Sequence, residues 1–223
     1  MKINIIGAGT WGTTLGCLLE KKSPNNEITI WQRNASKTNQ ILVSRTHLKI
    51  KEFKIPESIN FTSDLNELNF NELTIIAIPS STIKDVLPKD IQNGEYIIAS
   101  KGFDLNTGML SSELLQSKFN LKSDNIAVLS GPNHAEEIIM GKTSAAVVAS
   151  NNSNLSNRLQ KLFSSDTFRV YRSDDILGVQ IGAAVKNVIA IASGLCVGLD
   201  LGDNAQAALV SRGMNEIMNL SGI

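Results

Sequence analysis

The chain has 223 residues, and 42% of them are hydrophobic, enough for a sizeable core in one large domain or in one domain with part of another. The 21 Lys and Arg residues balance 21 Asp and Glu residues, which removes the electrostatic argument for a nucleic-acid or acidic-membrane partner and favours small-molecule chemistry. Neither Cys17 nor Cys196 has a neighbour at metal-ligand spacing, so we expect buried thiols in a reducing compartment and no metal site.

The first predicted strand, Lys2–Ile6, leads directly into the run GAGTWG at residues 7–12, which opens a helical pattern. Its apolar run is too short for a signal peptide or a membrane span, so we expect a cytoplasmic protein with no membrane insertion. Gly7 permits a tight turn, Gly9 lets backbone N–H groups approach a pyrophosphate, and Gly12 lets the helix pack closely on the strand. This order predicts a dinucleotide site; a plain glycine turn is the alternative.

The second predicted strand, Glu27–Gln32, is followed by Arg33. NAD-specific domains usually carry an acidic residue at this point to bind the ribose hydroxyls, and none is present here. Arg33 is placed to bind a 2′-phosphate by charge-assisted hydrogen bonds, which favours NADP(H) over NAD(H). An ordinary surface arginine is the alternative.

Further apolar runs predict strands, and several are apolar on successive residues, as parallel strands covered on both faces are. These runs are Leu73–Ile78, Tyr96–Ser100, Ile126–Ser130, Ala145–Ala149 and Phe168–Tyr171. After them, Ser173 to Asp175 supply a helix start, and no strand-like run follows. We therefore predict an α/β fold with two parts: a Rossmann-like, doubly wound parallel sheet over residues 1–172 and an incomplete all-helical domain over residues 173–223.

Two polar segments follow predicted strands, where open α/β sheets bind ligands. Lys101 stands at the carboxyl end of its strand and can reach a bound anion, although a solvated surface lysine fits equally well. The run SGPNHAEE at residues 130–137 predicts a tight turn and a helix start. Its N–H groups and the Asn133 amide could hold a polar substrate or nicotinamide. We interpret His134 as a helix-start residue, because no carboxylate in the run is spaced to orient it.

The segment from Ile176 to Ala192 predicts a helix that is apolar nearly all round and therefore buried. Lys186 is its one charged residue. Burial lowers the pKa of a lysine toward neutrality, which suits a general acid or base. The alternative is a lysine whose stem packs on the core while its amine reaches water.

Gly194, Gly198 and Gly202 are expected to break this helix. A second helical pattern runs from Ala205 toward Met218, with Asp203 or Asn204 as its N-cap. Helix packing is the favoured interpretation of this last segment.

Five motifs in register resemble the bacterial-type NAD(P)-dependent glycerol-3-phosphate dehydrogenases. They are GAGTWG, Lys101-Gly102, SGPNHAEE, GAAVKN at residues 182–187 and GDNAQAALVSRG at residues 202–213. The resemblance implies reduction of dihydroxyacetone phosphate, a phosphorylated triose, to sn-glycerol 3-phosphate by hydride from NADH or NADPH, supplying glycerophospholipid synthesis. A homodimer is compatible with it.

The resemblance also implies a role for individual residues. Lys186 is the implied catalytic acid/base and also contacts substrate. The implied cofactor residues, with the three glycines of the first turn, are Thr10, Trp11, Arg33, Lys101 and Ala135. Lys101 also contacts substrate, together with Gly131 and Asn133, although the family more often has Ser or Thr at this last position.

The family continues beyond Arg212-Gly213-Met214-Asn215-Glu216 through further helices with an aspartate and a Ser-Arg-Asn phosphate-binding motif, which this sequence does not contain. The sequence therefore fits either a truncated enzyme or a dinucleotide-binding module without efficient turnover. A related dehydrogenase acting on another 2-keto or 2-hydroxy compound is a further alternative, and GPNHAEE argues against it.

Overall fold

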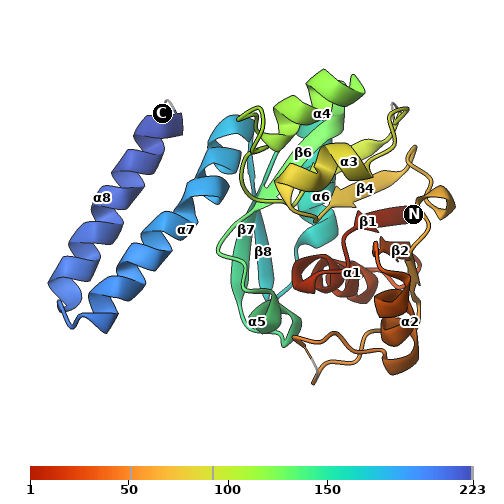
Figure 1. Cartoon of the computed structure of the whole chain (residues 1–223), viewed down its shortest axis with the longest axis horizontal. Coiled ribbons are helices and arrows are strands. Elements are labelled where there is room, and N and C mark those ends of the chain that lie inside the picture. The colour runs from red at the N-terminus through yellow and green to blue at the C-terminus, as the bar shows by residue number, and fades with distance from the viewer. Residues whose placement is uncertain (51, 92, 222–223) are drawn as a thin grey trace.

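A computed structural model describes residues 1–50, 52–91 and 93–221 (Figure 1). The strands are β1 (Lys2–Ile6), β2 (Glu27–Trp31), β3 (Ile59–Thr62), β4 (Leu73–Ile76), β5 (Glu95–Ile98), β6 (Ile126–Ser130), β7 (Ser144–Ala149) and β8 (Phe168–Ser173). The helices are α1 (Thr10–Lys22), α2 (Ala35–Ser44), α3 (Ile83–Val86), α4 (Ser111–Phe119), α5 (Ala135–Ile139), α6 (Ser153–Phe163), α7 (Ile176–Gly198) and α8 (Asp203–Ser221). The predicted α/β fold with a following helical part is confirmed.

The described strands form one eight-stranded sheet in the order β3-β2-β1-β4-β5-β6-β7-β8. From β1 the chain first winds outward to β3 and then returns to β4 on the other side, which is the doubly wound arrangement. The point where the winding reverses lies between β1 and β4. Ligands of such sheets bind there, outside the carboxyl ends of the strands.

Two features of the sheet differ from the prediction. β3 was missed, because it is a four-residue edge strand in which Asn60 is exposed, too short to give a clear pattern. β7 pairs antiparallel with β6, whereas a parallel sheet was expected. The five residues of α5 extend about 7.5 Å, too little to carry the chain back along a strand of about 17–20 Å, so it turns and runs the other way.

Two apolar cores cover opposite faces of the sheet. Ile75 and Ile97 belong to the core under α1 and α6, whereas their neighbours Ile76 and Ile98 belong to the core under α3 and α4. Successive side chains of a strand point to opposite faces, so strands buried on both sides need unbroken apolar runs. This explains the isoleucine-rich pattern of the sequence.

α7 was expected to be buried and to be broken by Gly194, Gly198 and Gly202, but it has few buried residues and Gly194 and Gly198 lie within it. The helix continues through Gly194 to Gly198, and only Gly202, with φ +81°, lies in the turn before α8. A glycine within a helix costs about 1 kcal/mol, which packing against α8 can offset.

The sheet covers only the first half of α7, and among the described residues α8 is its main neighbour beyond that (Figure 1). Val188, Ile191 and Leu195 are consequently 66%, 67% and 59% exposed. Among the described residues α7 is also the one helix long and apolar enough to cross a membrane by length and composition alone, a property shared by core helices of soluble proteins. The expected division after Arg172 falls one residue before the end of β8.

Candidate active site

The glycine turn after β1 has the geometry of an anion cradle. Gly7 has φ +117°, and a Cβ on Gly12 would lie 2.0 Å from the Gly7 carbonyl oxygen, so the turn and α1 are in direct contact. A Cβ on Gly9 would meet no described atom within 4 Å. Gly9 is also the N-cap of α1 and has no side chain to bind the first N–H groups, which leaves them for a ligand.

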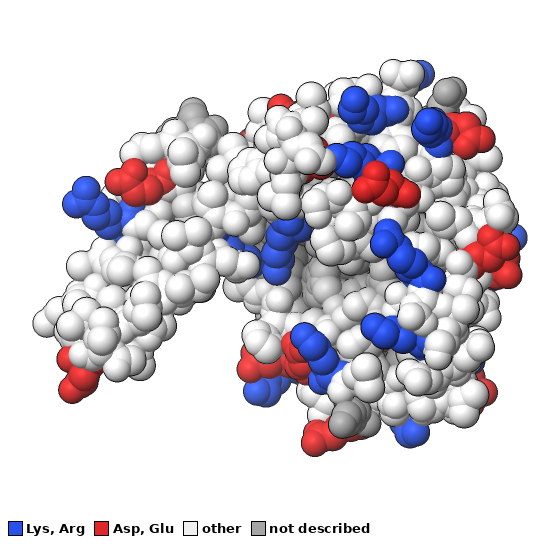
Figure 2. All heavy atoms as spheres, in the orientation of Figure 1, with Lys and Arg blue, Asp and Glu red and all other residues white. Residues whose placement is uncertain are grey.

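A cavity of about 690 Å³ lies over this turn. Its lining includes Gly7, Gly9, Thr10, Gln32, Lys37, Gln40, Ser44, Thr46, His47, Lys49 and Pro79. Figure 2 shows a hollow in this face of the molecule with Lys and Arg side chains on several sides of its rim. A basic rim around a helix N-terminus suits a phosphorylated ligand.

Three further residues predicted to contact the cofactor, Arg33, Trp11 and Ala135, are not in the lining of this cavity. Arg33 follows β2 and is exposed. The Trp11 ring packs edge-on against Phe168, with ring centroids 6.5 Å apart. The Ala135 carbonyl accepts a hydrogen bond from Thr14 Oγ1 at 3.3 Å, which fixes the start of α5 against α1.

Lys186 reaches from α7 to the turn after β6, where its Nζ donates a hydrogen bond to the Gly131 carbonyl oxygen. The same oxygen accepts from the Asn133 backbone N–H at 2.8 Å. A Cβ on Gly131 would lie 2.5 Å from the Ala145 carbonyl oxygen, so this turn is pressed against β7. Lys101 also interacts with Lys186, so these two lysines and the SGPNHAEE turn, far apart in sequence, meet near the carboxyl end of β6.

Burial, and secondly the positive charge of Lys101, lower the pKa of Lys186 to about 8. An amine with this pKa can give up or accept a proton near neutral pH. The side chain is only half-buried, so it combines a packed stem with an amine directed at the neighbouring turn. Chemically, the group can act as a proton donor and as a positive charge beside a reacting oxygen.

Other residues of the turn after β6 differ in their surroundings. Asn133 Oδ1 is buried and has no hydrogen-bond partner among the described residues, which leaves an acceptor for a ligand. His134 is the N-cap of α5, as expected, and its side chain is 74% exposed. The expectation that no carboxylate contacts it is wrong, because Glu136 Oε2 lies 3.2 Å from its Nδ1.

The structure adds site residues that the sequence did not reveal. His47, in the segment after α2, lines the cavity over the glycine turn, and burial lowers the pKa of its imidazole. No motif marks this segment, so only the fold brings it to the site. Gln180 is held by Ser112: its Oε1 accepts from the Ser112 N–H at 3.0 Å and its Nε2 donates to Ser112 Oγ at 2.7 Å. These bonds fix the first turns of α7, which carries Lys186, against α4.

In the described part of the chain, no group of three or more His, Cys, Asp or Glu residues could hold a metal ion. A Rossmann-like sheet, a glycine cradle at a helix N-terminus and a lysine of lowered pKa define a nicotinamide-dependent dehydrogenase.

Comparisons with known proteins identify the family of dehydrogenases. The model of the NAD-dependent glycerol-3-phosphate dehydrogenase N-terminus matches residues 2–156, and that of the C-terminus matches residues 175–222. The chain belongs to this family of oxidoreductases.

Individual relatives agree with the family models. Glycerol-3-phosphate dehydrogenase [NAD(P)+] of Fusobacterium nucleatum is 38% identical over 99% of this chain and 67% of its own length. The protein with the same name from Clostridium perfringens is 39% identical over 98% of this chain and 67% of its own length. The crystal structure of glycerol-3-phosphate dehydrogenase from Coxiella burnetii superposes with a TM-score of 0.86 at 29% identity, covering 99% of this chain and 68% of that one. The chain thus spans about two thirds of the length of these relatives.

Proposed function

We propose that this chain reduces dihydroxyacetone phosphate to sn-glycerol 3-phosphate with NAD(P)H. The observation that carries the proposal is the meeting of Lys186, Lys101 and the turn after β6 at the carboxyl edge of a sheet with a dinucleotide-type glycine turn. The relatives named for glycerol-3-phosphate and NAD(P)+ support this choice of substrate and cofactor.

The residues around the glycine turn fit a nicotinamide dinucleotide. The open space at Gly9 and the uncapped N-terminus of α1 would hold the pyrophosphate, with Thr10 beside it. Arg33 would bind a 2′-phosphate, which makes NADP(H) the preferred cofactor and NAD(H) the weaker one. When bound, the reduced nicotinamide supplies the hydride. Trp11 and Ala135 would border the site.

Lys186 would supply the proton. As the carbonyl carbon is reduced, negative charge develops on its oxygen, and a neighbouring ammonium both stabilises that charge and protonates it. A pKa of about 8 keeps most of the Lys186 amine protonated at neutral pH while making the proton easy to give up. Lys101 would contact the substrate phosphate, and Gly131 and Asn133 would contact the hydroxyl-bearing end.

The compartment and the metabolic role belong to the same proposal. The two cysteines are free and buried, which fits the reducing cytoplasm. There the product would feed glycerophospholipid synthesis.

A pair of measurements tests the proposal. Cofactor fluorescence reports dinucleotide binding, and the fall in NADPH absorbance after addition of dihydroxyacetone phosphate reports turnover. Ketopantoate and hydroxyisobutyrate serve as competing substrates. Binding with turnover on dihydroxyacetone phosphate alone supports the proposal. Binding without turnover on any substrate contradicts it and indicates a dinucleotide-binding module, and turnover on ketopantoate indicates a different dehydrogenase.

A further inference from the structure

The loop that carries Lys101 is tied to the segment after β4 on both sides of the lysine. Before it, Ser100 Oγ donates a hydrogen bond to the Ile78 carbonyl at 2.6 Å. After it, the Phe103 carbonyl accepts from Ser80 Oγ at 2.9 Å. Between these two points Gly102 has φ +99°, a value that L side chains rarely adopt. The backbone at Lys101 is therefore constrained, although its side chain is exposed.

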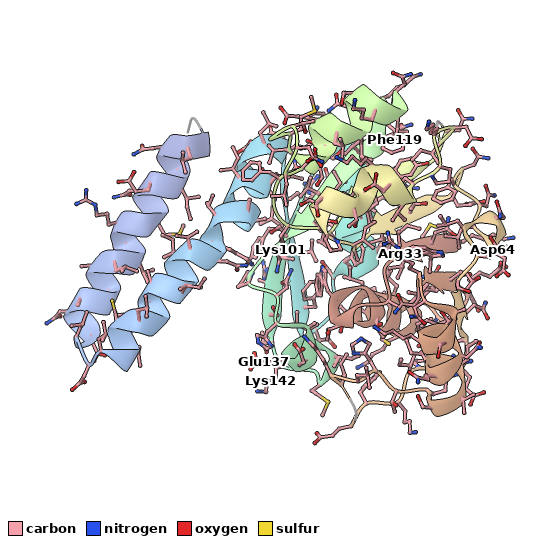
Figure 3. All side chains as sticks on the ribbon, viewed as in Figure 1. Arg33, Asp64, Lys101, Phe119, Glu137 and Lys142 are labelled. Carbon is pink, nitrogen blue, oxygen red and sulfur yellow. The ribbon has the colours of Figure 1, made fainter. Side chains whose placement is uncertain are left out.

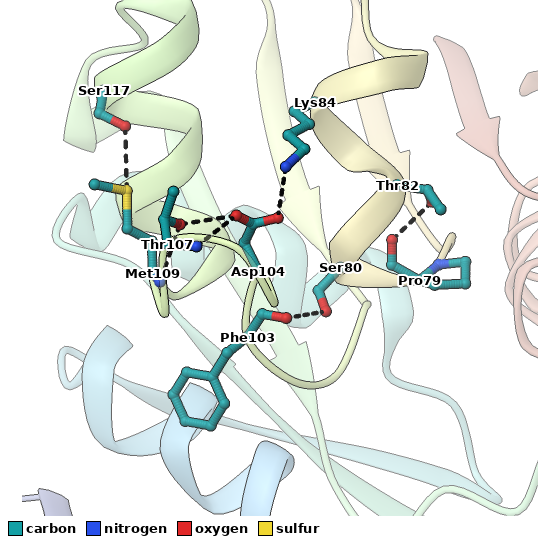
Figure 4. Close-up of polar contacts among 9 residues, drawn as sticks. All are labelled: Pro79, Ser80, Thr82, Lys84, Phe103, Asp104, Thr107, Met109 and Ser117. Carbon is teal, nitrogen blue, oxygen red and sulfur yellow. Dashed lines mark hydrogen bonds and ion pairs between the residues drawn. The ribbon is translucent and has the colours of Figure 1, made fainter.

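Asp104 provides a further attachment (Figure 4). It is 1% exposed, and its Oδ2 accepts from the Thr107 N–H at 3.1 Å and from Thr107 Oγ1 at 2.8 Å. Its Oδ1 has no hydrogen-bond partner among the described residues, but the Lys84 ammonium, from α3, lies 3.3 Å away. The Thr107 bonds, and then Lys84, lower the pKa of the Asp104 carboxyl, so it is charged at neutral pH.

A buried ion pair contributes little net stability, because removing two charges from water offsets most of their attraction. Such pairs are better explained when they select one conformation. Here a reason exists for holding the loop, since Lys101 and Lys186 carry like charges that repel each other. Without a fixed backbone, the exposed Lys101 side chain would move away into water.

We propose that Asp104, held by Lys84 and Thr107, is a positioning residue that keeps Lys101 beside Lys186. The proposal rests on the proposed roles of these two lysines in catalysis. Asp104 itself contacts neither substrate nor cofactor in this scheme; it acts through the loop.

The test measures the pKa of the Lys186 amine directly, without turnover. The full chain is pulsed with acetic anhydride between pH 6 and 10.5, and mass spectrometry gives the acetylated fraction of Lys186 at each pH. Asp104→Asn keeps an acceptor for Thr107 and removes the charge that pairs with Lys84. Because Lys101 is then free to move away, we expect the pKa of Lys186 to rise by at least about half the increase caused by Lys101→Met.

A double-mutant cycle distinguishes positioning from a general structural effect. In the Lys101→Met background, Asp104→Asn should leave the pKa of Lys186 unchanged, because no second charge remains to be positioned. Glu95→Gln is the matched control: it breaks the ion pair with Arg158 at the opposite end of β5 and should not change the Lys186 titration.

Three results would each overturn the positioning role. They are no shift in the pKa of Lys186 in Asp104→Asn, the same shift with and without Lys101, and no shift in Lys101→Met itself. If melting shows that Asp104→Asn unfolds, the double variant Asp104→Asn/Lys84→Met, which leaves no unpaired charge, replaces it. Because no assay depends on turnover, an inactive chain would contradict the proposed function without affecting this result.

Discussion

At the residue scale, the lowered pKa of Lys186 predicts how the reaction rate depends on pH. In the proposed mechanism the protonated amine is the donor in ketone reduction, so kcat/KM for dihydroxyacetone phosphate should fall as pH rises through about 8. In the reverse reaction, the oxidation of glycerol 3-phosphate, the neutral amine would be the base, so that rate should rise through the same pH. Parallel pH profiles in the two directions, measured at constant ionic strength, would contradict a single acid/base group.

Removing the amine tests its role separately. Lys186→Met keeps the volume of the side chain and removes the proton, so kcat should fall at least about a hundredfold. Cofactor affinity should stay the same, because the glycine turn is untouched. Lys142→Met is the control: this exposed lysine pairs with Glu137, apart from Lys101 in Figure 3, and should retain full activity. Near-normal turnover in Lys186→Met would exclude the acid/base role.

Arg33 determines the expected preference between the two cofactors. Arg33→Ala should lower kcat/KM for NADPH about tenfold or more and leave the value for NADH nearly unchanged, because only NADPH has the 2′-phosphate. Arg169→Ala, which removes an exposed arginine stacked on Tyr171, should change neither value. An unchanged NADPH-to-NADH ratio in Arg33→Ala would remove the assignment.

At the scale of elements, two glycines at the junction of β1 and α1 are expected to have different roles, one in packing and the other in binding. Gly12→Ala places a Cβ against the Gly7 carbonyl, so α1 must shift and the free energy of unfolding should fall by about 1–3 kcal/mol. In Gly9→Ala the added Cβ lies in open space, so this variant should have the melting temperature of the wild type but bind NADPH more weakly. Thermal melting and fluorescence titration of both variants check this contrast, and equal melting temperatures would contradict it.

The elements also show how far the sequence predicts this fold. β1 and β6 were predicted with their observed ends, because both are isoleucine-, valine- or leucine-rich runs followed directly by glycine turns. β3 and the direction of β7 depend on strand length and on neighbouring elements, which a local pattern does not contain. α7 was predicted as a helix from its composition, but burial depends on what surrounds a helix.

The residues of the candidate site likewise fall into those that the sequence predicts and those that it does not. Lys101, Gly131 and Lys186 were predicted from motifs, and the structure places them together. His47 and Asp104 were not predicted, because their importance comes from contacts with residues distant in sequence and not from any motif. The sequence thus indicates residues that belong to recognisable motifs, and misses residues that only the fold brings to the site.

At the scale of the whole molecule, the hydrogen bonds of Gln180 with Ser112 help to join α7 and α8 to the α/β part. Gln180→Leu would leave the buried Ser112 N–H without its partner and should lower the free energy of unfolding by about 1–3 kcal/mol. Gln206→Leu removes a similar bond, to Ser193, that joins only α7 and α8 and is partly buried, so its effect should be smaller. Urea unfolding of both variants measures the difference, and equal losses would contradict it.

The reversed direction of β7 has a consequence for where Lys186 lies. β8 is parallel to β7, so it ends at the edge of the sheet where β1 to β6 begin, and α7 starts from that edge. Lys186 lies ten residues after Ile176, a rise of about 15 Å along the helix, which is roughly the length of β6. The amine thus arrives beside Gly131, just past the end of β6. Had β7 and β8 followed the other strands, the same helix would begin at the ligand-binding edge and carry its lysine away from it.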